Sequence, residues 1–174
     1  NIYMEQFFSF GYPNRVKSSS DAQWLNAVRE LPTASVITVA YYSLVKIADS
    51  EPAAASFARK AFWCPVSEVP ALAFDHNQIL DKARQSLKIK LRMQPVGFEL
   101  LPEKFTLGQL QRVYETILGT SLDKRNFRRK ILNKGFLKAL PEKQKGVPHK
   151  RALLYEFDKV TYDRLSSEQF NFDF

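Results

Sequence analysis

Three closely spaced arginines are the residues of this sequence best suited to binding a charged ligand. Arg125, Arg128 and Arg129 stand at positions i, i+3 and i+4, so they share one surface if the segment is helical. Arginine can bind guanine through two hydrogen bonds, and Asn126 can bind adenine in the same way. The surrounding stretch, 104–151, holds thirteen basic and three acidic residues, a net charge of +10 in a chain of net charge +8. We therefore expect a polyanion as partner, because each neutralised phosphate releases condensed counterions.

Local signals around these arginines predict two helices joined by a tight turn. Thr106 begins a capping box, and an apolar face follows it as far as residue 117. Gly119 can end this helix because glycine takes a left-handed conformation at low cost. Asp123 can then cap a second helix, with Phe127 and Ile131 on its buried side. Such a pair of helices is typical of a helix-turn-helix.

The residues after the second helix have the pattern of a wing. Two short strands are predicted over 136–140 and 152–157, and the basic loop 141–151 between them holds a glycine and two prolines. The helix would contact bases and the loop would hold flanking phosphates. A solvated charged face that docks a protein is the alternative, and the helix-turn-helix layout favours nucleic acid over it. The predicted DNA-binding residues are Lys124, Arg125, Asn126, Arg128, Arg129, Lys130, Lys143, Lys145, His149, Lys150 and Arg151.

The first hundred residues predict a mixed α and β structure. Strands are expected over 2–12, 35–47 and 61–64, and a helix over 74–93. The strand 35–47 is nearly all apolar, so we expect both of its faces to be covered. Segment 13–32 is predicted as a long surface loop with room for one helical turn around 22–30.

Several classes of protein are disfavoured by what the sequence lacks. It has no glycine-rich phosphate loop, no Cys-x-x-Cys and no His-x-x-x-His, and we predict no catalytic residue, no metal ligand and no cofactor. The single cysteine, Cys64, suits a reducing compartment. No apolar run approaches the roughly 20 residues that span a bilayer. We expect a cytoplasmic protein that does not contact a membrane.

The order of segments resembles the Nudix-related transcriptional regulators, which join a Nudix-type domain to a C-terminal winged helix. The segments that carry this resemblance are FGYPNR (10–15), VAYY (39–42), WCPVSEVP (63–70), LAFDH (72–76), FTLGQLQ (105–111) and LDKRNFRR (122–129). The most specific part is 105–130. The resemblance implies an α+β fold with a partial Nudix-like domain over 1–94, a linker over 95–102 and a winged helix-turn-helix domain over 103–174.

The resemblance also implies a function. Members of the family are typically dimers that bind palindromic operators and control NAD-metabolism or sugar-utilisation genes, often as repressors. Their effector is ADP-ribose or a related nucleotide in one branch and a pentose such as arabinose in another. The residues that correspond to an effector site are Arg15, Phe10, Tyr12, Tyr41 and His76.

Two departures keep other functions open. The Nudix box is not among these residues and would fall just before Asn1, so the chain resembles a product trimmed at that point. A Nudix pyrophosphatase acting on ADP-ribose or nucleoside diphosphate sugars, with an accessory nucleic-acid-binding domain, is therefore the alternative. A third possibility is an RNA-binding or protein-docking adaptor. Segment 16–33 is longer than the family loop, which leaves the effector open, and 94–102 is the expected hinge.

Overall fold

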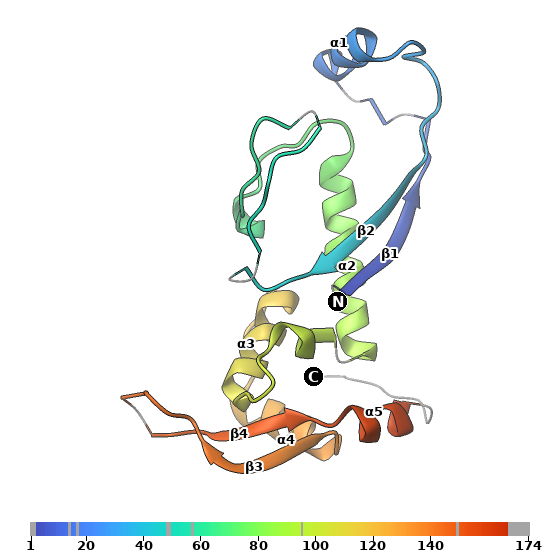
Figure 1. Ribbon diagram of the computed structural model, residues 1–174. Helices are drawn as coiled ribbons and strands as arrows, with labels where there is room; N and C mark the ends of the chain where they lie inside the picture. The colour runs from blue at the N-terminus through green and yellow to red at the C-terminus, as the bar shows by residue number, and fades with distance from the viewer. Residues whose placement is uncertain are drawn as a thin grey trace. The chain divides into compact units, whose positions relative to one another are not determined.

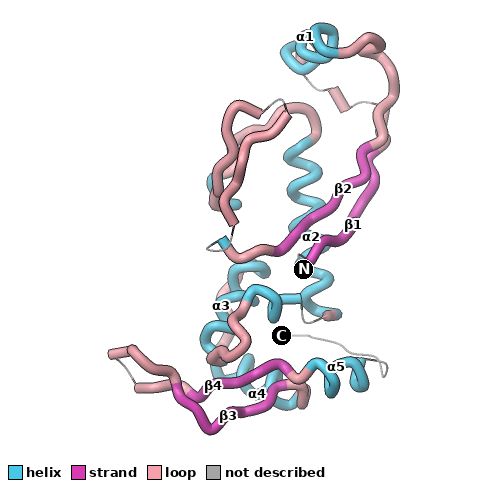
Figure 2. The backbone as a smooth tube through the Cα atoms, in the orientation of Figure 1, coloured by secondary structure: helices cyan, strands magenta, loops and turns pink. Residues whose placement is uncertain are grey.

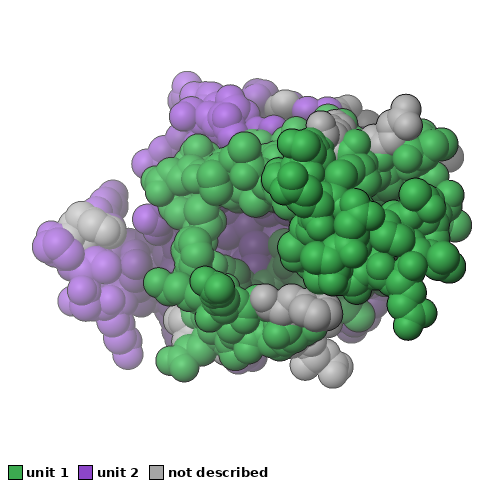
Figure 3. Space-filling model, turned by 90° about the horizontal axis from the view of Figure 1, so that it is seen from above, with its two compact units in different colours: residues 1–86 green, residues 87–174 purple. Residues whose placement is uncertain are grey.

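The computed structural model describes residues 3–166 apart from positions 14, 17, 48, 49, 57, 95 and 149 (Figure 1). The chain forms two compact units, residues 1–86 and 87–174, which Figure 3 shows in green and purple. None of the helices in the described ranges combines the length and apolarity needed to cross a bilayer. The α+β fold class is confirmed, since both units contain helices and antiparallel strands.

The first unit is built around one antiparallel pair of strands, β1 (Tyr3–Phe10) and β2 (Thr38–Leu44). Phe10 and Ala40 are buried, whereas Val39 is 47% and Tyr41 is 54% exposed. The prediction that both faces are covered is thus wrong for β2, which is also shorter than the predicted 35–47. Alternation along a strand sends successive side chains to opposite faces, and here only one face is packed.

Two further predictions for this unit are corrected by the structure. Segment 13–32 contains a ten-residue helix, α1 (Ser19–Val28), because Ser18 caps it by accepting the Asp21 N–H at 3.0 Å. No strand forms at 61–64. The described chain between β2 and α2 is mainly loop, with the short 3-10 helix η2 (Val66–Glu68), as Figure 2 shows. A short apolar segment becomes a strand only when a partner edge is available.

Helix α2 (His76–Met93) agrees with the prediction of a helix over 74–93, and it crosses the division between the units. Its first part lies beside the β1–β2 pair (Figure 1), and the Lys82 ammonium stands 5.1 Å from the centre of the Phe8 ring. Leu91, near its end, is 1% exposed and belongs to the second unit.

The second unit contains a winged helix-turn-helix. Its elements are η3 (Val96–Leu100), α3 (Leu107–Leu118), α4 (Lys124–Asn133), β3 (Leu137–Lys143), β4 (Leu153–Phe157) and α5 (Lys159–Ser166). An aromatic core holds them together: the rings of Phe98 and Phe157 stack at 4.5 Å, and Phe136 meets each of them edge-on at 5.7 Å. The predicted helices and strands of this part are confirmed, with β3 running three residues further than 136–140.

The described part of segment 95–102 packs into this core. Val96, Phe98 and Leu101 are all less than 9% exposed. A segment that buries three apolar side chains is held by the unit it contacts, so its movement would expose them to water. The boundaries 1–94, 95–102 and 103–174 stay predictions, while the packing makes 94–102 a poor place for a hinge.

Candidate nucleic-acid interface

Helix α3 begins and ends where its sequence predicts. Thr106 Oγ1 accepts the Gln109 N–H at 3.2 Å, and Gln109 Oε1 accepts the Thr106 N–H at 2.8 Å, which completes a capping box. Gly119 ends the helix with φ of +70°. Both ends are decided by backbone groups that the helix itself leaves unsatisfied, which is why sequence alone locates them.

The turn between α3 and α4 is fixed by two side chains that the sequence did not single out. The Glu115 carboxylate accepts the Leu122 N–H at 2.9 Å and the Gln111 amide at 3.0 Å. Gln111 in turn donates to the Leu122 carbonyl at 2.9 Å. These hydrogen bonds, that of Leu122 first, lower the pKa of Glu115. The sequence could have predicted the contact between Gln111 and Glu115, because side chains spaced i, i+4 lie on one face of a helix.

Helix α4 packs on α3 as predicted and leaves a charged face outward. Asp123 caps it by accepting the Asn126 N–H at 2.7 Å. Phe127 is 2% exposed and Ile131 is fully buried. The ring of Phe127 meets that of Tyr114 on α3, with 5.5 Å between centres. This docking fixes the rotation of α4 about its axis, and therefore fixes which side chains face away.

The outward face of α4 contains Arg125 and Arg129, which are both exposed. Arg129 Nη2 donates to Asn126 Oδ1 at 2.8 Å. The same face continues with Leu132, which is 41% exposed, and with Asn133. The sequence could have placed both on this face, because they follow Arg125 by seven and eight residues, or about two helical turns.

Arg128 differs from the other two arginines of the predicted cluster. It is half-buried, and its Nε is covered with no hydrogen-bond partner in the described structure. Its position follows Phe127 by one residue, or about 100° around the helix, so it lies at the edge of the core-facing side. The predicted shared surface therefore holds for Arg125 and Arg129, with Arg128 at its margin.

Two further predicted cations lie on α4, where Lys124 is exposed and Lys130 is half-buried, and the wing carries the others. Lys143, Lys145, Lys150 and Arg151 are exposed, and Gly146 bends the loop with φ of +70°. His149 lies outside the described residues. These side chains stand on a hairpin whose base is held by β3 and β4.

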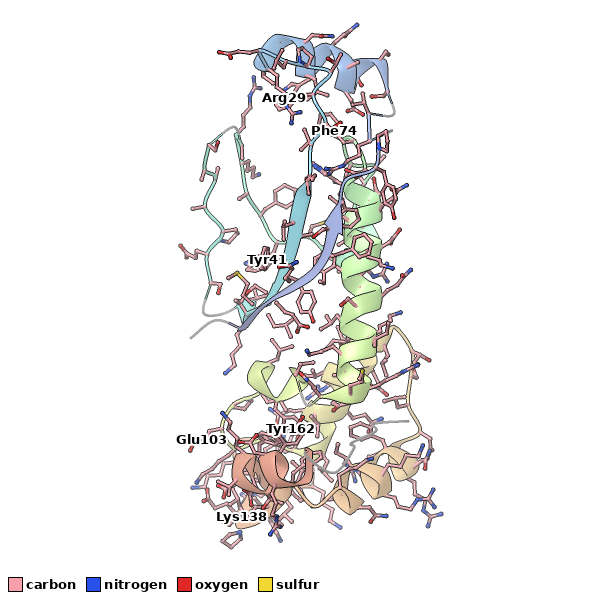
Figure 4. The ribbon with its side chains drawn as sticks, turned by 90° about the vertical axis from the view of Figure 1, so that its right-hand side faces the viewer. Arg29, Tyr41, Phe74, Glu103, Lys138 and Tyr162 are labelled. Atoms are coloured by element: carbon pink, nitrogen blue, oxygen red, sulfur yellow. The ribbon has the colours of Figure 1, made fainter. Side chains whose placement is uncertain are left out.

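Two other cations of the basic stretch are paired with acids. Lys104 Nζ lies 2.6 Å from Glu142, and Lys138 Nζ lies 2.9 Å from Glu156. Hydrogen bonds to these carboxylates raise the pKa of both lysines. Figure 4 labels Lys138 on this unit. Neither lysine was predicted to bind DNA, and their pairing reduces the positive potential they contribute.

None of the five residues predicted for an effector site is among those that line the cavity where α1 and α2 begin. Arg15 pairs with Asp75 and donates to the Phe10 carbonyl at 3.4 Å. Tyr41 is exposed on β2 and donates to Gln6, and Tyr12 is 66% exposed. His76 is also exposed, with its ring 5.7 Å from that of Phe74. In Figure 4, Tyr41 and Phe74 lie well apart.

A cavity of about 510 Å³, with both polar and apolar side chains on its wall, lies in the first unit where α1 and α2 begin. Two carboxylates stand on its wall: Asp21, 8% exposed, accepts the Phe74 N–H, and Asp75, 3% exposed, pairs with Arg15. Its lining comprises Ser18, Ser20, Asp21, residues 71–75, Asn77 and Gln78. Within the described ranges no three His, Cys, Asp or Glu residues gather as a metal site would require.

The second unit is a winged helix domain of the DNA-binding class. Its turn is held by side-chain hydrogen bonds, its basic helix faces outward, and its hairpin is basic. Residues 97–157 match the sequence model of the family described as NrtR DNA-binding winged helix domain. Residues 97–157 are therefore similar to an NrtR-type winged helix domain, and the resemblance to Nudix-related regulators predicted from the sequence is confirmed.

The similarity to known proteins covers more of the chain than the winged helix domain. The chain is 30% identical over 163 residues to the ADPR responsive transcriptional repressor NtrR of Acinetobacter baylyi, covering 92% of this chain and 58% of that protein. The crystal structure of Shewanella oneidensis NrtR complexed with a 27mer DNA matches with a TM-score of 0.62 and 26% identity, over 98% of this chain and 68% of that one. A further crystal structure of Shewanella oneidensis NrtR has a TM-score of 0.61 and 29% identity, over 89% and 64%. The chain thus spans less than two thirds of the length of its curated relative.

Proposed function

We propose that this protein is a transcriptional repressor that binds duplex DNA through α4 and the wing and responds to a small ligand. One observation carries the proposal: α3 and the fixed turn orient α4 so that Arg125 and Arg129 face outward. The names of the Acinetobacter baylyi repressor and of the Shewanella oneidensis complex with DNA support it.

In this proposal α4 enters the major groove and the wing binds the flanking phosphates. An α-helix fits the major groove of B-DNA, and its outward side chains then reach base edges. The wing cations Lys143, Lys145, Lys150 and Arg151, together with His149, supply contacts that position the helix without reading sequence. A homodimer would place two copies of α4 on the half-sites of a palindromic operator.

Binding to a defined duplex tests the proposal. The probe is a labelled copy of the 27mer duplex crystallised with the Shewanella oneidensis relative, with a shuffled duplex of equal composition as control. We expect tighter binding to the first and a steep loss of affinity with rising salt, because several phosphates are neutralised. Equal affinity for both duplexes would argue for an adaptor or an RNA-binding protein.

We also propose an effector, an ADP-ribose-like nucleotide or a pentose, and the cavity of the first unit as the place where its sugar binds. The description of the Acinetobacter baylyi relative as ADPR responsive supports the nucleotide. Carboxylates, hydroxyls and amides suit the hydroxyl groups of a sugar; Asp21 and Asp75 provide the carboxylates, Ser18 and Ser20 the hydroxyls and Asn77 the amide. Arg15, Phe10, Tyr12, Tyr41 and His76 stay predicted effector contacts.

A built-in fluorophore can report on this cavity. The ring of Trp24 lies 5.8 Å from that of Phe74, which lines the cavity wall. In a Trp63→Phe variant Trp24 is the remaining tryptophan, because the chain has two. We expect ADP-ribose or arabinose to change its fluorescence and to lower affinity for the duplex, whereas adding Gln78→Phe to the same variant, which fills the cavity without adding a tryptophan, should abolish both responses. Ligand-independent DNA binding with unchanged fluorescence would exclude this effector site.

We infer a regulator and not an enzyme, and the repressor name of the relative supports this inference. The alternative Nudix pyrophosphatase predicts that the chain releases AMP from ADP-ribose in the presence of magnesium. Incubation of the purified protein with both, followed by chromatography of the nucleotides, separates the two functions. Turnover that increases with protein concentration would favour the enzyme.

A further inference from the structure

A hydrogen bond joins two polar side chains on the outward face of α4. Arg129 Nη2 donates to Asn126 Oδ1 at 2.8 Å, one turn earlier on the same helix. The two side chains therefore form a unit before any DNA is bound. The sequence alone predicts separate roles, with arginine for guanine and asparagine for adenine.

Asn126 is itself held from the other side. Its backbone N–H donates to the Asp123 carboxylate at 2.7 Å, so the first turn of α4 is fixed by the cap. Asp123, Asn126 and Arg129 follow one another at intervals of three residues, which places them along one stripe of the helix. The cap thus fixes the backbone of Asn126, and the side chain of Asn126 restrains Arg129.

The hydrogen bond affects the two side chains unequally. Two-point recognition of adenine needs the amide oxygen and the amide N–H₂ of asparagine together. In Asn126 one lone pair of the oxygen already accepts from Arg129, so an adenine contact would have to use the other lone pair with the amide held in the orientation that suits Arg129. An arginine has five N–H donors, so Arg129 keeps four after this contact and can still offer a pair of donors to O6 and N7 of guanine.

We propose that Arg129 reads a guanine in the operator and that Asn126 is its positioning residue, not an independent reader of adenine. A long, flexible side chain loses conformational freedom when it binds, and a side chain already restrained in an outward position loses less. Asn126 therefore increases discrimination at the base pair that Arg129 contacts. This inference rests on the proposed DNA-binding function.

The test is selection of preferred sites by the chain of residues 1–174 from a pool of randomised duplexes, followed by affinity measurements at each base pair. The variants are Arg129→Ala, Asn126→Ala, Asn126→Asp and the double variant of Arg129→Ala with Asn126→Ala. Asn126→Asp keeps an oxygen that can accept from Arg129 but removes the amide donors. Lys145→Ala, on the exposed wing, serves as a matched control that removes one cation away from α4.

We expect Arg129→Ala to reduce the preference for guanine at one base pair by roughly ten- to a hundredfold, the range of a two-point base contact. Asn126→Ala should reduce the preference at that same base pair, and the double variant should match Arg129→Ala alone. Asn126→Asp should retain the guanine preference, although its added negative charge weakens binding to all sites. Lys145→Ala should weaken all sites alike and lessen the salt dependence.

Two results would overturn the inference in distinguishable ways. If the wild-type chain selects no sequence, the proposed function fails and the inference fails with it. If the wild-type chain is specific, but Asn126→Ala changes a different base pair from Arg129→Ala or Asn126→Asp behaves like Asn126→Ala, then Asn126 reads its own base. In that case the DNA-binding function stands and the positioning role is wrong.

Discussion

Arg15 and Asp75, sixty positions apart in the sequence, form a two-point ion pair in the first unit. Nε lies 2.6 Å from Oδ2, and Nη2 donates to Oδ1 at 3.0 Å. The remaining guanidinium nitrogen, Nη1, donates to Thr38 Oγ1 at 2.8 Å and to the Val36 carbonyl at 3.2 Å. One side chain therefore ties the segment after β1 to the start of β2 and to the residue before α2.

Removing the guanidinium should destabilise this unit strongly. We expect Arg15→Ala to lower the free energy of unfolding by about 3 kcal/mol, because it leaves the buried Asp75 carboxylate without its counter-ion. Urea unfolding followed by tryptophan fluorescence measures this loss, since Trp24 and Trp63 both lie in the first unit. Arg29→Ala, at an exposed position, is the control and should change stability by less than about 0.5 kcal/mol. Equal losses in the two variants would show that the ion pair contributes nothing specific.

The same pair predicts how stability depends on pH. The hydrogen bond from Arg15 holds the pKa of Asp75 below its ordinary value of 3.8. A carboxyl group whose pKa is lowered by folding stabilises the protein above its unfolded pKa, and this contribution is lost as pH falls through the folded pKa. We therefore expect the stability difference between the wild type and Asp75→Asn to be full at neutral pH and to shrink below pH 3.8. Urea titrations at a series of pH values check this, and a difference independent of pH would contradict it.

Two glycines of α3 should respond to alanine in opposite directions. Gly119 has φ of +70°, where a Cβ is strained, so Gly119→Ala should destabilise the second unit by about 1 kcal/mol. Gly108 lies within the first turn of the helix, and a Cβ there would meet Thr106 Oγ1 at an ordinary 3.8 Å. Gly108→Ala should therefore stabilise by about 0.5–1 kcal/mol. Thermal unfolding followed by circular dichroism measures both, and a shared sign would contradict the assigned conformations.

The exposed arginines of α4 should matter more for DNA binding than a paired lysine of the same domain. We expect Arg125→Ala and Arg129→Ala each to weaken specific binding by ~1–3 kcal/mol. Lys138→Ala is the matched control, since the Lys138 ammonium is already paired with Glu156 at 2.9 Å. Its effect should be small and independent of sequence. Gel shifts on the selected operator measure all three, and unchanged affinity in both arginine variants would refute the role given to α4.

An acidic residue of the wing should oppose DNA binding. Glu142 pairs with Lys104 at 2.6 Å, and both side chains are about half exposed. We expect Glu142→Gln to raise affinity for duplex DNA a few-fold at low salt, because it removes a negative charge and releases the ammonium for a phosphate. The gain should fade as salt increases, and stability should change little, since exposed ion pairs contribute about 0–1 kcal/mol. Weaker binding by this variant would instead mean that the pair holds the wing in position.

The sequence determined the winged helix because its signals are local. The cap at Thr106, the end at Gly119 and the cap at Asp123 each involve residues within a few positions of one another. The rotation of α4 follows from Phe127 and Ile131 by helical periodicity alone. These features do not depend on distant parts of the chain, so they could be predicted before the fold was known.

Tertiary structure decided the features that join distant residues. No local pattern says that Arg15 meets Asp75, that one face of β2 stays exposed, or that 61–64 finds no partner strand. The half-buried position of Arg128 and the contact between Arg129 and Asn126 likewise depend on rotamers chosen by their surroundings. Periodicity fixes the direction in which a side chain leaves the backbone. Packing fixes what that side chain meets, because contact energies depend on neighbours that the chain brings together only when it folds.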